Sequence, residues 1–141
     1  MTVTLQEQWS ISFEMRMTSA FGRGHHNFVN TKAGRYPGIY DPDQADPPSG
    51  FCCSDGEGGP TSSSPTWGSS LVGEVLLIEF KRTRQANGEY LSEYLVNGEV
   101  KASDTSSTIG IGGQVTTFCG RYSHQTPKAV MRNLDVYYYA G

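Results

Sequence analysis

Three carboxylates lie close together in the run Asp-Pro-Asp-Gln-Ala-Asp, which ends at Asp46. Calcium is a hard cation that takes oxygen ligands, so a cluster of this composition could hold it. The spacing departs from that of an EF-hand loop, because Ala45 stands where an oxygen ligand is needed and no glycine occupies the sharp turn. We therefore expect either a calcium site made by Asp41, Asp43 and Asp46 or a solvated acidic loop stiffened by prolines.

Trp67 stands in the most loop-like run of the chain, residues 56–70, which reads GEGGPTSSSPTWGSS. An indole face offers an apolar platform on which a sugar ring or another flat ligand can stack. Trp67 either is displayed for binding or tucks under its own loop. If it is displayed, its polar partners should come from the loops of residues 20–70, where the candidates are Asn30, Arg35, Asp41, Asp43 and Asp55.

Motifs for common catalytic chemistries are missing from the sequence. There is no Gly-x-Ser-x-Gly elbow for a serine nucleophile, and the glycines at 110–113 lack the lysine and the helix of a phosphate loop. Cys52, Cys53 and Cys119 either all stay reduced or form one bridge to Cys119, which leaves one thiol over. Their spacing relative to the three histidines is not that of a zinc site. We expect no catalytic residues.

Length and composition indicate one all-β domain over residues 1–141. Seventeen glycines and seven prolines suit a loop-rich β structure, and no window keeps a helical apolar period for three turns. The net charge is −3 and the basic residues are scattered, so nucleic acid is not an expected partner. Neither a signal peptide nor an apolar run long enough for membrane insertion is present in this sequence.

Strands must position the candidate residues. The most clearly predicted strands lie in the stretch 71–103. Leu76, Ile78 and Phe80 alternate with Leu77, Glu79 and Lys81, which predicts a strand with one buried face. Asn-Gly pairs at 87–88 and 97–98 can supply the positive φ angles of two-residue hairpin turns. Three consecutive antiparallel strands are therefore predicted.

Strong alternation also predicts a core strand over Gln8–Thr18, with Trp9 on its buried side. The last strand, Ala129–Tyr139, keeps one buried face, made of Met131, Leu134, Val136 and Tyr138, only if a bulge lies near Arg132-Asn133, because the apolar spacing changes from three to two there. In that strand Tyr138 should point inward and its tyrosine neighbours outward. Shorter strands are expected at His26–Lys32 (with Phe28 or Val29 inward), Tyr36–Asp41, Phe51–Ser54 and Val115–Tyr122.

The order of these patterns resembles a known superfamily. An alternating first strand, the long strand EVLLIEFKR, the hairpin YLVNGEVKAS, the crossing IGIGG and the bulged last strand AVMRNLDVYYY occur in that order. The chain is similar in this respect to the concanavalin A-like lectin/glucanase superfamily, and to laminin G-like modules in particular. The resemblance implies an antiparallel β-sandwich of jelly-roll type with adjacent N- and C-terminal strands.

Two functional patterns of that superfamily are incomplete here. The glucanase signature Glu-x-Asp-x-x-Glu does not occur, so a polysaccharide hydrolase or lyase is disfavoured. Fragments of the galectin pattern, His26-Asn27 and Trp67-Gly68, lack their continuation. We therefore expect a non-catalytic, lectin-like module that binds a glycan, with Trp67, Asn30, Arg35 and Asp55 as ligand-binding residues and calcium as its candidate cofactor.

The alternative interpretation is a structural or adhesive module of a larger assembly, such as a phage tail, a virion or a cell-surface protein. The tyrosine-rich C-terminal strand favours it, because an exposed strand edge can pair with another protein or with a second copy. In both interpretations we expect an extracellular or surface-associated location within a larger protein.

Overall fold

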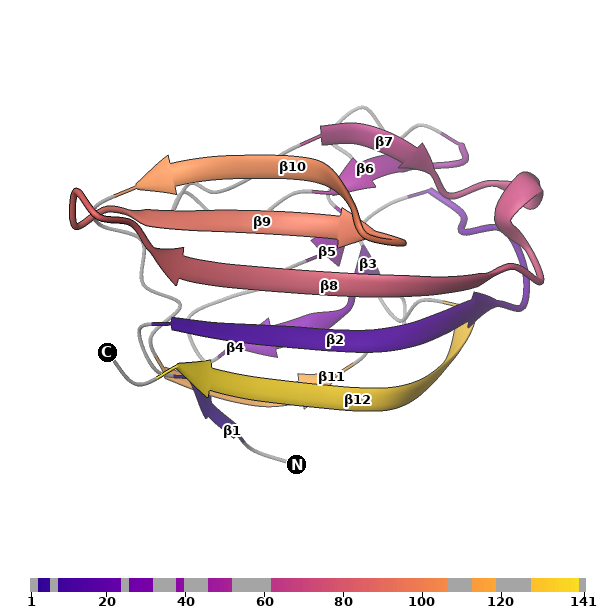
Figure 1. The fold of residues 1–141 in the computed structure, drawn as a ribbon. Helices are drawn as coiled ribbons and strands as arrows, with labels where there is room; N and C mark the ends of the chain where they lie inside the picture. The colour runs from indigo at the N-terminus through magenta and orange to yellow at the C-terminus, as the bar shows by residue number, and fades with distance from the viewer. Residues whose placement is uncertain are drawn as a thin grey trace.

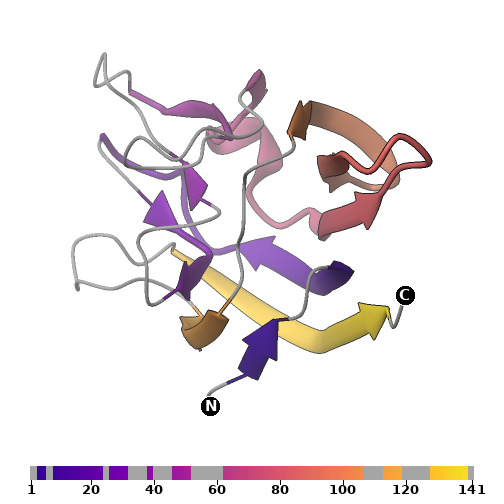
Figure 2. The ribbon, with the colours of Figure 1, turned by 90° about the vertical axis from the view of Figure 1, so that its left-hand side faces the viewer.

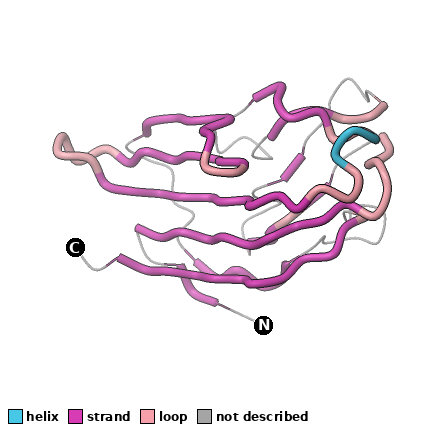
Figure 3. The backbone as a smooth tube through the Cα atoms, turned by 45° about the vertical axis from the view of Figure 1, so that its right-hand side comes forward, coloured by secondary structure: helices cyan, strands magenta, loops and turns pink. Residues whose placement is uncertain are grey.

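The computed structural model describes residues 3–5, 8–23, 26–31, 38–39, 46–51, 62–106, 113–118 and 128–139. These residues form antiparallel β-sheets, as predicted, and their helical content is one short 3-10 turn, η1 (Ser69–Leu71), drawn in cyan in Figure 3. Short strands stand behind a large sheet (Figure 1), and a view turned by 90° separates the two layers (Figure 2). The structure is therefore an all-β sandwich.

The large sheet has five strands in the order β10-β9-β8-β2-β12. Its members are β2 (Gln8–Met17), β8 (Val75–Arg84), β9 (Tyr90–Val96), β10 (Glu99–Ser106) and β12 (Ala129–Tyr139). Each neighbouring pair is antiparallel, and the chain's first long strand lies between the central meander and the last strand.

The meander predicted for residues 71–103 is confirmed as β8, β9 and β10. Asn97 and Gly98 form a two-residue turn with φ angles of 52° and 79°. The turn at Asn87-Gly88 is longer than predicted. Gln85 donates its backbone N–H to Glu89 O at 2.7 Å, and of the turn residues Gly88 has the positive φ, so Asn87 stays in an ordinary conformation.

Alternation correctly identified β2, whose five apolar side chains are all buried. The bulge predicted in β12 is also confirmed, since the register with β2 shifts between Arg132 and Asp135 and Asn133 has φ 54°. Asparagine tolerates this left-handed conformation better than most residues do. Leu134 is exposed, which corrects its expected place on the buried face, because the bulge turns it outward.

The second layer consists of short strands. One sheet has the order β1-β11-β4, and two pairs are β3-β5 and β6-β7. The bounds are β1 (Val3–Leu5), β3 (His26–Asn27), β4 (Val29–Thr31), β5 (Gly38–Ile39), β6 (Ser49–Phe51), β7 (Ser62–Thr66) and β11 (Gly113–Phe118). The expectation that residues 56–70 form only a loop is wrong for β7, which pairs with β6.

Aromatic rings fill the space between the layers. The large sheet contributes the inward side chains of two strands: Trp9, Ile11, Phe13, Met15 and Met17 of β2, and Leu76, Ile78 and Phe80 of β8. Four aromatic residues from outside that sheet pack against them: Phe21, Phe28, Phe51 and Trp67. Phe28 lies 6.2 Å from Phe13 and 6.3 Å from Phe80, measured between ring centroids. This burial of large rings supplies the main apolar contacts that hold the two layers together.

Candidate functional site

Trp67 is a core residue, not a displayed one. Its side chain is 0% exposed, and its indole N–H donates to Gly50 O at 2.8 Å. One ring face stacks on Phe21 at 5.7 Å, and Phe51 meets it edge-on at 5.2 Å. Both ring faces and the polar N–H are thus occupied by the protein itself. The displayed interpretation of Trp67 is corrected, and the tucked alternative is confirmed.

The other predicted site residues are placed only in part. Asn30 lies on β4 with its backbone opposite Thr117, and its side chain is outside the described part. Asp46 is exposed in the bend before Pro47. Arg35, Asp41, Asp43 and Asp55 lie outside the described residues, as do Cys52, Cys53 and Cys119. Their roles stay predictions, and the described ranges hold no group of three His, Cys, Asp or Glu side chains that could bind a metal.

A different surface has the features of a binding site: the outer face of the five-stranded sheet, which is turned away from the core and toward the viewer in Figure 1. Four branched aliphatic side chains are exposed on it, on β8, β10 and β12. We call them the aliphatic band: Val75, Leu77, Val100 and Val130. Val75 and Val130, at the beginnings of β8 and of the edge strand β12, are 50% and 53% exposed.

The register brings the band residues together across the strands. Val75 lies opposite Arg16, which lies opposite Val130, so the three side chains form one row across β8, β2 and β12. Leu77 occupies the next row, opposite Glu14. Val100 lies opposite Leu95, which lies opposite Glu79, so it stands two strands from β8 and one row beyond Leu77. The band is therefore a group of apolar side chains interrupted by charged ones, Arg16 among them.

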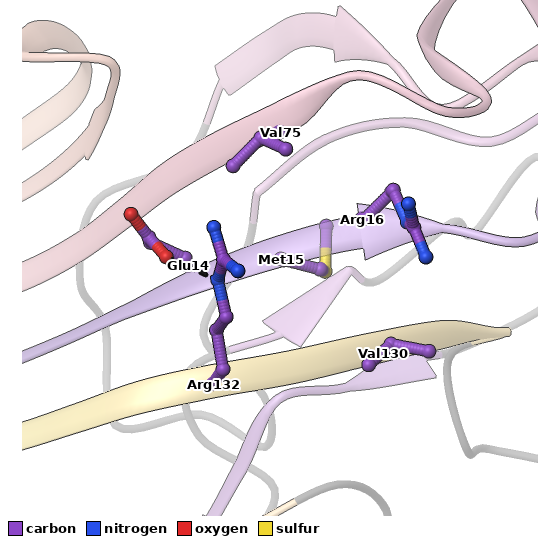
Figure 4. Close-up of a pocket in the computed structure, with 6 residues that line it drawn as sticks. All are labelled: Glu14, Met15, Arg16, Val75, Val130 and Arg132. Atoms are coloured by element: carbon purple, nitrogen blue, oxygen red, sulfur yellow. Dashed lines mark hydrogen bonds and ion pairs between the residues drawn. The ribbon is translucent and has the colours of Figure 1, made fainter.

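A shallow groove of about 240 Å³ crosses the band and is lined by Glu14, Met15, Arg16, Val75, Val130 and Arg132. Glu14 accepts hydrogen bonds from Arg132 Nε at 2.5 Å and from Asn133 Nδ2 at 2.9 Å. Figure 4 shows Glu14 and Arg132 turned toward one another, with Arg16 apart from them. Since its lining holds two guanidinium groups and one carboxylate, the groove carries a net positive charge on a chain whose net charge is −3.

The far half of the same face is polar around one aromatic ring. Tyr137 is 57% exposed, as predicted for a neighbour of Tyr138, and lies opposite Ser10, which lies opposite Lys81. Asp135 occupies the adjacent row and is exposed, so a carboxylate lies on the same face near the exposed ring.

Sequence reasoning missed the aliphatic band, although a signal for it exists. The run Val75-Leu76-Leu77-Ile78 is apolar on both faces of its strand, whereas a strand with one solvated face should alternate. Val75 and Leu77 thus stand out as apolar residues on the solvent side. Their proximity to Arg16 and Val130 depends on cross-strand register, which the sequence does not reveal.

Within the described ranges no helix has the length and apolarity needed to cross a membrane. No family model, no curated protein and no solved structure matches this chain.

Proposed function

We propose that this chain is a non-catalytic binding module that contacts other proteins, copies of itself included, through the outer face of its five-stranded sheet. The observation that carries this proposal is the aliphatic band, since exposed apolar patches with polar surroundings mark protein interaction sites. In this function the chain is a structural or adhesive part of a larger assembly, displayed on a surface such as that of a virion, a phage tail or a cell.

The size of the face suits such a contact. Five strands spaced about 4.8 Å apart, with about 3.3 Å per residue along each, cover an area of roughly 20 by 30 Å. A stable protein interface buries roughly 800 Å² on each partner, which is of the same order. A broad surface of this kind is better matched to another protein than to a small molecule.

The resemblance to concanavalin A-like modules agrees with this proposal. β2, the first long strand, lies beside β12, the last strand, whereas the N-terminal strand β1 pairs with β11. We include jelly-roll connectivity in the proposal on the ground of the resemblance.

Sedimentation over a range of concentrations tests the proposed contact. The average mass of the wild-type chain should rise above the 15.4 kDa of the monomer, and Leu77→Asp should keep it at 15.4 kDa because it places a charge inside the band. Ser63→Asp is the matched control, since it adds the same charge to an exposed residue of β7, which belongs to the second layer and not to the outer face. A wild-type chain that stays monomeric at the highest concentrations would argue against the proposal.

Carbohydrate binding is the second candidate, now favoured by Tyr137 instead of Trp67. An exposed ring near an exposed carboxylate is an arrangement that can stack on a sugar and accept hydrogen bonds from its hydroxyl groups. The Asp41, Asp43 and Asp46 calcium proposal belongs to the same candidate.

Thermal melting with a panel of oligosaccharides, with and without calcium, tests this second candidate. A ligand that binds only the folded state stabilises it by about 2.7 kcal/mol at a hundredfold excess over its Kd. The midpoint should rise with one sugar and lose that rise in Tyr137→Ala, whereas Val130→Ala should keep it. A rise with calcium alone would support the acidic loop, and no rise with any sugar would reject carbohydrate binding.

A further inference from the structure

We propose that the groove around Arg16 is the specificity point of the outer face, and that it takes a carboxylate flanked by apolar side chains on a partner protein. This inference rests on the proposed function, because it assumes that the outer face makes the contact. It adds the chemical class of the group that is recognised.

The side chain of Arg16 is exposed, and no described residue forms an ion pair or a hydrogen bond with its guanidinium. The nearest carboxylate on the face, Glu14, already accepts from Arg132 and Asn133 on the neighbouring strand. Among the described residues, therefore, none occupies the planar set of N–H donors of Arg16.

Apolar side chains lie on both sides of the Arg16 guanidinium. Val75 and Val130 flank Arg16 directly in the row across the sheet, and each exposes half of its surface. Covering them with apolar groups would remove water from both sides of the guanidinium. A charge-assisted hydrogen bond is strengthened when its surroundings are dry.

The groove should distinguish between classes of anion. Guanidinium groups bind carboxylates and phosphates with two parallel hydrogen bonds, so charge alone does not distinguish them. The two valines distinguish a carboxylate from these anions, because a phosphate or a sulfate has no apolar substituents to place against the valine side chains. A glutamate or aspartate in an extended segment with aliphatic residues at positions i−2 and i+2 presents all three groups on one side.

Charge complementarity at long range points the same way. The chain as a whole carries −3, so acidic partners are repelled except where a local positive charge offsets it. The groove, with two guanidinium groups and one carboxylate, is such a place. An acidic group would thus be guided to Arg16 instead of to other parts of the surface.

NMR titration of the ¹⁵N-labelled full chain tests the inference with defined probes. The peptide Ac-Val-Ser-Glu-Ser-Val-NH₂ should shift the Arg16 Nε resonance and the amides of Val75 and Val130, with at least tenfold tighter binding than the matched glutamine peptide. Arg16→Gln should abolish the response. Arg84→Gln should keep it, because it removes the same charge from another exposed arginine at the opposite end of the sheet.

Each other outcome overturns the inference. Equal shifts with the glutamate and glutamine peptides would remove the role of the carboxylate, and equal shifts with sodium sulfate would reduce the groove to a general anion site. A response to glucuronate and not to peptide would assign it to an acidic glycan. Shifts that grow only with the protein's own concentration would assign it to a second copy. No response to any probe would reject the site.

The sedimentation experiment separates this failure from that of the proposed function. If Leu77→Asp abolishes association while the peptides do not bind, the outer face is an interface and Arg16 does not select a carboxylate. If neither association nor peptide binding occurs, both proposals fall.

Discussion

Trp67→Ala should destabilise the fold by about 3–5 kcal/mol, the range measured for removal of large buried aromatic side chains. The indole is fully buried between Phe21, Phe28 and Phe51, so its loss leaves a cavity that these rings can fill only in part. A domain of this size is stable by about 5–15 kcal/mol, so such a loss is a large share of the total. Urea unfolding followed by circular dichroism measures it.

Trp67→Phe separates the ring from its hydrogen bond. Phenylalanine keeps most of the apolar contacts but cannot donate to Gly50 O, so a buried carbonyl loses its partner. An unsatisfied buried acceptor costs about 1–3 kcal/mol. If both substitutions cost less than about 1 kcal/mol, Trp67 is not the centre of the core, and its role as a binding platform would return.

The position of Trp67 also explains why a polar, proline-containing segment becomes a strand. Trp67 donates its backbone N–H to Pro48 O at 2.9 Å and accepts from Phe21 N at 3.0 Å, so it joins β6, β7 and the loop after β2. Ser62–Thr66 has no apolar alternation of its own. It is held as a strand by pairing with Ser49 and Phe51 and by the indole anchored at its end.

The long strands were predictable because their evidence is local. Trp9 to Met17 alternate without interruption, and Asn97-Gly98 fits one turn type in both positions. The bulge in β12 followed from a change of apolar spacing within one strand. In each case the physical cause lies within ten or so residues of the chain.

The candidate site was not predictable in the same way, because its cause is long-range. Arg16, Val75 and Val130 come from three distant parts of the sequence and meet only through the order β8-β2-β12. Trp67 shows the converse error. A single aromatic residue in a run of small residues has no local core to join, which allowed the interpretation that it is exposed. Phe21, Phe28 and Phe51, from other parts of the chain, supply the core that its sequence neighbours lack.

Gly50→Ala should cost about 3 kcal/mol or more, because two separate constraints meet at this glycine. Gly50 has φ 75°, a conformation that a side chain makes unfavourable. A Cβ there would also overlap the backbone carbonyl of Ser62, which belongs to the paired strand β7 and cannot turn aside as a flexible side chain could. The substitution must therefore push β6 and β7 apart, and with them the carbonyl that holds the Trp67 indole.

Gly73→Ala is the control that isolates the second constraint. Gly73 has a similar φ of 84°, but no heavy atom lies within 4 Å of the position where its Cβ would stand. Gly73→Ala should lower the free energy of unfolding only by the conformational cost of the positive φ, about 1–2 kcal/mol. Chemical unfolding of both variants, with tryptophan fluorescence as a second probe, measures the difference between them. Equal losses would mean that β6 and β7 do not lie as close together at Gly50 as the register requires, whereas a larger loss at Gly50 would make this glycine the point where the second layer is fastened to the core.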